Sequence, residues 1–227
     1  MMEENSTYIN DNYIVEEELC NVAGITKNDL TDLIQNHLVP DASYVITKII
    51  KITSPLNDEF LNESTEKYFN KSCISLIQKN KNIQDPSDYK EEFKNKFIQN
   101  LVNHPDKTFA YGNMFKENIP NAEKLDEAFE EEWEAYCNGI YGICTLNSSE
   151  EEIVKKEIAV KKLIRFNTEY SGKTLTKDEL NELITLNEEF NEVAHKFAPY
   201  QRALSSRGKC LDKILDQNNL NHLVKKY

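Results

Sequence analysis

The sequence predicts a mainly α-helical protein with a small N-terminal module, and three observations support this fold class. Apolar residues recur at helical spacing through most of the 227-residue chain. Residues 14–40 have the rhythm of a helix-turn-helix, and residues 43–54 carry a strong strand pattern. After Pro55 we expect a helical domain of about five helices. The predicted division is a helix-turn-helix-like module with a short β element, residues 1–55, and a helical domain, residues 56–227.

The N-terminal module is predicted from turn and cap residues. Within IVEEELCNVAGITKNDLTDLIQNHLVP, Gly24 supplies the turn after a first short helix, and Thr26 is the expected N-cap of a second. Pro40 stops that second helix. The next segment, SYVITKIIKITS, is rich in β-branched residues and partly alternating, which predicts a short strand or one arm of a hairpin.

The first helices of the second domain are predicted from their apolar stripes. One is expected over STEKYFNKSCISLIQKN, and the next begins at Pro86 with an apolar residue at every fourth position. Residues 104–121 are expected to form a loop with exposed aromatic residues. The segment AEKLDEAFEEEWEAY is expected to be a helix with Trp133 on its apolar side and a block of acids on the other.

Glycines and capping residues delimit the remaining helices. Two glycines interrupt CNGIYGICTLN, and Ser148 or Ser149 then caps EEEIVKKEIAVKKLIRF. Thr176 and Glu179 are expected to form the capping box of the next helix, and Pro199 ends it. A last helix is expected over the C-terminal residues.

The net charge of −12 is unevenly distributed. Residues 196–227 carry seven Lys or Arg and two Asp or Glu, so this segment is +5 and the rest of the chain is −17. An acidic body disfavours nucleic-acid binding, because attraction to phosphate supplies most of the non-specific affinity. Five scattered cysteines predict reduced thiols and a cytoplasmic location. The acidic start is not a secretory signal, and no apolar run predicts a membrane span.

Residues 14–40 resemble the DNA-reading unit of MerR-type regulators through a shared hydrophobic skeleton, made of Ile14, Leu19, Val22-Ala23-Gly24-Ile25, Leu30, Leu33 and Leu38-Val39-Pro40. The resemblance implies a DNA-binding transcriptional regulator. The residues that would then contact DNA are Lys27, Asn28, Thr31 and Gln35.

The surface that would read DNA departs from that family. Members usually have an Arg-Tyr pair where Thr31 and Asp32 stand, and a glycine where His37 stands. The stretch also holds five acids and one base, Lys27, whereas a recognition helix normally approaches phosphates with Arg or Lys. We therefore favour a structural or protein-binding role for the helix pair and keep the DNA reader as the alternative.

Two motifs resemble an uncharacterised bacterial family, known only as a domain of unknown function. The first is W-x-x-Y-x-x-G-x-Y-G-I-C-T at residues 133–145, and the second is F-A-P-x-x-R-x-x-S-S-R at residues 197–207. The family's N-terminal part also looks like residues 14–44, and Gln201 stands where an acidic residue is expected. Some members carry a natural-product biosynthesis label, so the resemblance implies that setting for this chain.

The two motifs also supply the candidate ligand- or partner-binding residues. Trp133, Tyr136 and Tyr141 would wall a pocket. The candidates for holding a phosphate or carboxylate are Arg202, Ser205, Ser206 and Arg207. A structural alternative stays open for both sets. The aromatic residues would belong to the core, and the arginines would pair with the acids Glu130, Glu131, Glu132 and Glu134.

Catalytic spacing is absent from the sequence. It contains no HExxH, Walker loop, GxGxxG or GxSxG, and no two histidines at helical spacing, so neither a metal nor a cofactor is predicted. The first hypothesis is a non-catalytic binding or regulatory protein for an unidentified small molecule or protein. The alternatives are a MerR-like DNA-binding regulator and a biosynthetic enzyme with Cys144 or a carboxylate as its reactive group.

Overall fold

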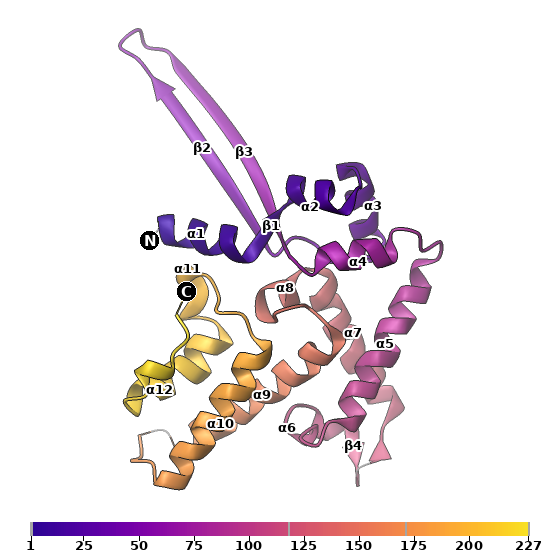
Figure 1. Cartoon of the computed structure of the whole chain (residues 1–227), viewed down its shortest axis with the longest axis vertical. Helices are drawn as coiled ribbons and strands as arrows, with labels where there is room; N and C mark the ends of the chain where they lie inside the picture. Colours follow the sequence, from indigo (N-terminus) through magenta and orange to yellow (C-terminus); the bar gives the residue numbers. More distant parts are fainter. Residues whose placement is uncertain (1, 118, 171, 227) are drawn as a thin grey trace.

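The fold is mainly α, as predicted, and Figure 1 shows it in a computed structural model that describes residues 2–117, 119–170 and 172–226. Most of the body is built from the four longest helices, α5 (Pro86–Asn103), α7 (Ala122–Cys137), α9 (Glu150–Tyr170) and α10 (Lys177–Val193). At the N-terminal end, a small sheet extends into a long hairpin that leaves the body.

The N-terminal elements are α1 (Met2–Asn12), β1 (Tyr13–Val15), α2 (Glu16–Ala23) and α3 (Lys27–Gln35). The predicted turn and N-cap are confirmed. Gly24 adopts a left-handed conformation with φ +67°, and the Thr26 hydroxyl accepts a hydrogen bond from the Asp29 N–H at 3.1 Å. After α3, His37 has φ +56°, a conformation that glycine adopts most easily.

A long antiparallel hairpin dominates the sheet. β2 (Tyr44–Thr53) pairs with β3 (Glu59–Asn70) from Tyr44↔Tyr68 to Thr53↔Glu59. β1 pairs only with the last three residues of β3, so the strand order is β1-β3-β2. The strand predicted over residues 43–54 is confirmed as the first arm of this hairpin.

The helix predicted over residues 64–80 is wrong in its first part. Residues 64–70 belong to β3, and only α4 (Cys73–Asn80) is helical. Pairing with β2 determines the structure of this stretch, because its β-branched and aromatic residues also suit a strand. Residues 104–121 likewise contain more structure than the predicted loop. They form α6 (Thr108–Tyr111), the 3₁₀ turn η1 (Gly112–Met114) and the short strands β4 (Phe115–Lys116) and β5 (Ile119–Pro120).

The N-cap predictions hold in the second half of the chain, but the predicted helix end at Pro199 is wrong, because α10 ends at Val193 and Pro199 begins the next short helix. A short helix, α8 (Ile140–Cys144), follows Gly139, and the Ser149 hydroxyl then accepts from the Glu152 N–H at 3.3 Å at the start of α9. Thr176 and Glu179 form the expected capping box of α10. The predicted last helix is divided into α11 (Pro199–Arg202), the π-helical η2 (Arg207–Asp212), α12 (Lys213–Gln217) and the 3₁₀ turn η3 (Asn221–Leu223).

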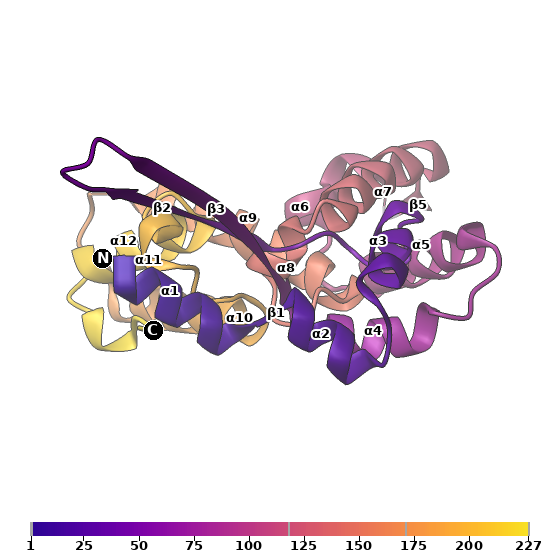
Figure 2. The ribbon, with the colours of Figure 1, turned by 90° about the horizontal axis from the view of Figure 1, so that it is seen from above.

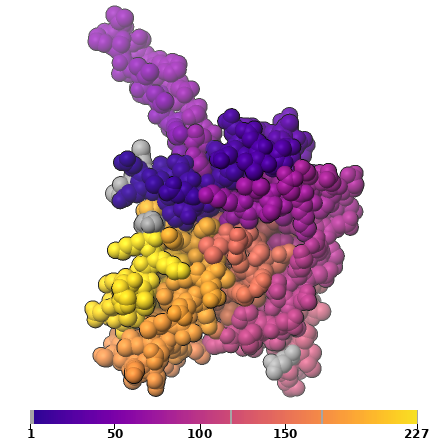
Figure 3. Space-filling view, viewed as in Figure 1, coloured from indigo at the N-terminus to yellow at the C-terminus, as the bar shows by residue number. Residues whose placement is uncertain are grey.

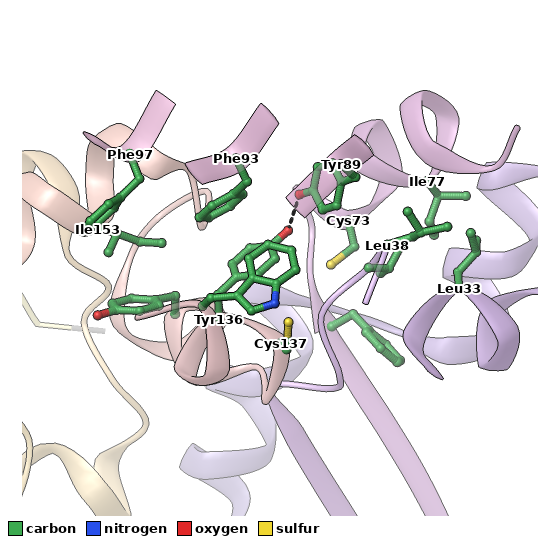
Figure 4. Packing of buried hydrophobic residues seen from close by; sticks show 14 of the residues in the cluster. Leu33, Leu38, Cys73, Ile77, Tyr89, Phe93, Phe97, Tyr136, Cys137 and Ile153 are labelled. Carbon is green, nitrogen blue, oxygen red and sulfur yellow. Dashed lines mark hydrogen bonds between the residues drawn. The ribbon is translucent and has the colours of Figure 1, made fainter. Parts of the chain in front are cut away.

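The largest hydrophobic cluster joins the N-terminal helices to the body. Leu19 of α2 and Phe69 of β3 belong to the same cluster as Phe93, Trp133 and Ile153 of the long helices (Figure 4). The boundary predicted at residues 55 and 56 falls in the turn between β2 and β3. The division into two domains stays a prediction.

Two smaller clusters complete the interior. One lies between α9, α10 and the C-terminal helices and includes Leu163, Phe190 and Leu215. The other holds Tyr13, Tyr44 and neighbouring tyrosines at the base of the hairpin. No helix in the described part of the chain combines the length and apolar character needed to cross a lipid bilayer.

Candidate interaction surface

The aromatic residues of the first predicted site are part of the core. Trp133, Tyr136 and Tyr141 are all buried, and the rings of Trp133 and Tyr136 stack with centroids 5.5 Å apart. The Tyr136 hydroxyl is hydrogen-bonded to the Tyr89 hydroxyl at 2.7 Å (Figure 4). Trp133 and Tyr136 line two different surface depressions, of about 480 and 400 Å³. The structure therefore does not bring the three residues together around one pocket.

Tyr141 belongs to a separate polar network that the sequence motifs did not reveal. The Glu132 carboxylate accepts hydrogen bonds from the Tyr141 hydroxyl and, at 3.0 Å, from the Tyr111 hydroxyl. Burial raises the pKa of Glu132, although the two hydroxyls oppose that rise. Close by, the buried Lys156 forms an ion pair of 2.7 Å with Glu157. These groups satisfy one another inside the fold, which is the arrangement expected of a structural network.

The arginines of the second predicted site bind groups of the neighbouring segments of the chain on both sides. The guanidinium of Arg202 binds Asp212 through two hydrogen bonds of 2.7 and 3.0 Å. It also donates to the Lys196 carbonyl at 2.9 Å. The structural alternative predicted that this arginine pairs with the acids of residues 130–134. That prediction is wrong, because Arg202 contacts the carboxylate of Asp212.

Arg207 is the more deeply buried of the two, with 1% of its surface exposed. Its guanidinium donates to the Asn191 side chain at 2.7 Å and to the carbonyls of Ala194 and His195 at 3.0 and 2.9 Å. These carbonyls follow the end of α10, where helix geometry leaves acceptors without a partner. Burial lowers the pKa of Arg207 to about 10. The partners of Arg207 are thus not the predicted glutamates.

The two serines between the arginines also lie against the chain. The Ser205 hydroxyl donates to the Arg202 carbonyl at 2.7 Å and accepts from the Gly208 N–H at 3.2 Å. Ser206 is half-buried and precedes η2. A ligand for this segment would have to displace hydrogen bonds that the protein already makes, so anion binding here stays a prediction.

The four residues predicted to read DNA are exposed on α3. Their helical spacing places Lys27, Thr31 and Gln35 along one face, with Asn28 beside them. Lys27 already forms an ion pair of 3.2 Å with Glu16, and Asp32 is also exposed on this helix. The structure brings the four residues together on an acidic surface, and whether they contact DNA stays a prediction.

We next consider Cys144, proposed above as a reactive group of an enzyme, and the side chains that could hold a metal ion in the described residues. Cys144 is half-buried, and burial raises the pKa of its thiol, which disfavours the reactive thiolate. Among residues 2–117, 119–170 and 172–226, no group of three or more His, Cys, Asp or Glu side chains is arranged to hold a metal ion.

The hairpin, residues 44–70, offers the most conspicuous free surface, and we call it the arm (Figures 1 and 3). Two ion pairs stabilise its strands across the ladder, Lys48 with Glu66 at 2.7 Å and Lys51 with Glu59 at 2.8 Å. In the turn, the Asp58 carboxylate accepts a hydrogen bond from the Ser54 N–H at 3.0 Å. These contacts define a regular hairpin over its whole length.

The arm is unusually apolar for an exposed hairpin. Of the fourteen large hydrophobic residues exposed in the described part of the chain, seven lie on it. They are between 51% and 86% exposed: Val45, Ile49, Ile50, Ile52, Leu56, Phe60 and Leu61. Exposed apolar surface often marks an interaction site where it is contiguous. The β-branched run of residues 45–52 was a possible signal for this surface, but it was interpreted only as a strand.

The base of the arm is fixed to the body by tyrosines. The rings of Tyr13 and Tyr44 meet edge to face at 4.8 Å, and the Tyr44 hydroxyl accepts from the Gln201 side chain at 2.5 Å. Gln201, which replaces the acidic residue expected in the family motif, therefore links that motif to the arm. Seen from above, the arm lies on the same side of the molecule as α1 and α11 (Figure 2).

The comparisons with known proteins identify the helical body. A model described as "Family of unknown function (DUF6058)" matches residues 89–219, which is more than half of the chain. The chain belongs to this family. The predicted resemblance to an uncharacterised family is thereby confirmed, and no activity comes with the family. The match covers both sequence motifs and begins after the arm. Searches of curated proteins and of solved structures give no match.

Proposed function

We propose that this protein is a non-catalytic, protein-binding member of its family, and that the arm is its binding element. The observation that carries the proposal is the concentration of seven exposed apolar residues on one projecting hairpin. Covering such residues is favourable by roughly 25 cal/mol per Å² of apolar surface removed from water. Another protein supplies that cover through side-chain packing and through pairing with a strand edge.

The strand edges add a second binding element to the apolar side chains. β2 lies at the edge of the sheet, and β3 has β1 beside it only at residues 68–70. Most of the arm therefore has open backbone N–H and C=O groups on both sides. Proteins usually guard long edges with proline, bulges or charges. β2 contains no proline, and its charged residues Lys48 and Lys51 are neutralised across the ladder.

The contacts of the other candidate residues favour binding over catalysis. The predicted aromatic and arginine residues are occupied by internal contacts, so the exposed arm is the better candidate for a partner. A cytoplasmic location and a link to natural-product biosynthesis belong to the same proposal, and they rest on the scattered cysteines and on the family resemblance.

A photo-crosslinking experiment tests the proposal. We would replace Phe60 of the arm by benzoylphenylalanine in cells that naturally produce the protein, irradiate them, and identify the products by mass spectrometry. We expect protein adducts from Phe60 and none from the same probe at Ile164, an exposed apolar residue of α9. Equal labelling from both positions, or none from either, would refute binding through the arm.

A DNA-binding regulator is the second candidate, and the order of elements favours it. α2 and α3 are joined by a tight turn and followed by a hairpin, which is the arrangement of a winged helix-turn-helix. The charges oppose it, since α3 exposes Asp29 and Asp32 and the turn of the arm carries Asp58. Fluorescence anisotropy with DNA from upstream of the gene tests this candidate. Sequence-dependent binding that weakens with salt would support a DNA-binding regulator, and no binding at low salt would exclude it.

A further inference from the structure

The two faces of the arm differ in character, and the register defines them. Side chains alternate along each strand, and cross-strand partners share a face. One face carries Tyr44 and Tyr68, which pack in the tyrosine cluster at the base, and we call it the inner face. The inner face continues toward the turn with the pairs Ile46↔Glu66, Lys48↔Ser64, Ile50↔Asn62 and Ile52↔Phe60. The outer face carries Val45↔Lys67, Thr47↔Thr65, Ile49↔Glu63, Lys51↔Leu61 and Thr53↔Glu59.

The exposed apolar residues of the inner face gather near the turn, where Ile52↔Phe60 is the one cross-strand pair of the arm with two exposed apolar partners. Ile50, Ile52 and Phe60 lie close together there with more than half of each side chain exposed, and the ion pair of Lys48 with Glu66 separates them from the half-buried Ile46 at the base. On the outer face, Ile49 and Leu61 each stand opposite a charged residue. Apolar side chains scattered among charges are common on protein surfaces, so the inner face is the surface that lacks its partner.

We infer that the partner of the inner face is the inner face of a second copy of this chain, so that two arms stack face to face in a two-fold symmetric dimer. The inference rests on the proposed function, because it specifies which protein the arm binds. Stacked β-sheets bury such faces at a separation of about 10 Å with their strands roughly aligned. A self-complementary face is what an isologous contact requires, since each copy presents the same residues to the other.

The charges of the inner face permit a second copy to bind there. The whole chain carries −12, so two copies repel one another over most of their surfaces. The inner face holds one base and one acid, Lys48 and Glu66, already joined in an ion pair of 2.7 Å. It is therefore neutral, and the arm carries it away from the acidic body. A nucleic acid would gain nothing from a neutral face, because its affinity depends on cations.

The size of the face sets the strength of the dimer. A ten-residue strand pair is about 33 Å long and about 10 Å wide, so the inner face alone offers on the order of 300–400 Å² per copy. Tyr200 and Leu204 are also exposed, close in sequence to Gln201, which binds Tyr44 at the base. An interface of this size is small compared with the roughly 800 Å² per partner of a standard complex. We therefore expect a reversible dimer with a dissociation constant in the micromolar range.

Neighbouring isoleucines on opposite faces give a matched pair of variants for the test. Ile50→Lys places a charge on the inner face, and Ile49→Lys places the same charge on the outer face one residue away. Both side chains are exposed, so both variants should keep the fold, which circular dichroism checks. Sedimentation equilibrium of the full chain then measures the mass against the 26.4 kDa of one copy.

We expect a concentration-dependent dimer whose dissociation constant rises at least about tenfold in Ile50→Lys and changes by less than about twofold in Ile49→Lys. Added salt should strengthen it, because screening reduces the repulsion between two acidic chains. A monomer at all concentrations, or equal weakening by both variants, would overturn the inference. Binding of the monomer to phosphatidylcholine–phosphatidylglycerol vesicles would overturn it in favour of a membrane. Adducts of the Phe60 probe with a different protein would leave the proposed function standing in each of these cases.

Discussion

Arg207 and Ile50 each occupy an environment that is unusual for their type of side chain. The charged side chain of Arg207 is 1% exposed, whereas the apolar side chain of Ile50 is 51% exposed. Arg207 comes from a distinctive motif, and every contact described for it is internal. Ile50 comes from a plain β-branched run and faces solvent on a projecting hairpin. Motif residues can therefore serve the fold, while the surface available to partners carries no motif.

The difference has a physical origin in how each region satisfies its groups. The segment after α10 leaves backbone carbonyls open, and Arg202 and Arg207 supply the donors for them from one short stretch. The fold constrains these residues strongly, because few side chains can reach several carbonyls at once. The arm constrains the identity of its residues less, because its strands pair through backbone hydrogen bonds and require only side chains that suit a strand.

The largest expected effect is the loss of Arg207. In Arg207→Ala, three buried acceptors lose their donor and a large side chain leaves a cavity, so the free energy of unfolding should fall by about 3–5 kcal/mol. Urea unfolding measures this loss, and Lys209→Ala, an exposed neighbour, serves as the control with an expected change within about 0.5 kcal/mol. A loss below about 1 kcal/mol would mean that Arg207 is kept for a ligand and contributes little to the fold.

The next effect concerns His195, which the same segment holds in its neutral form. Burial, followed by the charges of Arg207 and Lys196, lowers the pKa of His195 to about 4 from 6.5. Between these two values the unfolded chain binds a proton that the folded chain does not, so the stability rises with pH. The full contribution is present above about pH 6.5, and about 2–3 kcal/mol is lost as the pH falls toward 4.

Unfolding measured across this range in the parent chain and in His195→Gln isolates the effect. The Asn70 side chain lies 3.3 Å from His195 Nε2, and glutamine keeps a polar group near it. We expect the difference in stability between the two proteins to depend on pH only below about 6.5. Parallel curves for both proteins would show that His195 titrates normally in the folded state.

Local signals predicted much of the helical architecture. Gly24, Thr26 and Thr176 act through neighbours within four residues, so their roles as turn and cap residues follow from the sequence alone. The strand at residues 44–53 was predicted for the same reason, because its β-branched composition is local. The family assignment also follows from short motifs that can be read directly.

Contacts that depend on the tertiary fold could not be predicted from the sequence. β3 shows no clean alternation, because alternation arises when one face of a strand is buried, and most of β3 is exposed on both faces. The residues of 64–70 therefore matched a helical stripe as well as a strand. The partner of Arg202 is a single acid ten residues further along the chain, whereas the four glutamates clustered on α7 were the more obvious candidates. Which acid an arginine meets depends on the tertiary fold.

The smallest expected effect is on the stability of the arm itself, and it sharpens the comparison with Arg207. Ile50→Thr keeps a β-branched residue and changes an exposed side chain, so the free energy of unfolding at low protein concentration should change by less than about 0.5 kcal/mol. The control is Ile77→Thr in α4, where the side chain is fully buried and a loss of about 2–3 kcal/mol is expected. Because a dimer that involves the arm would add stability only by mass action, the cost of Ile50→Thr should grow as the protein concentration rises. A cost above about 2 kcal/mol at low concentration would instead place Ile50 in the folding core, and the arm would no longer be a surface reserved for a partner.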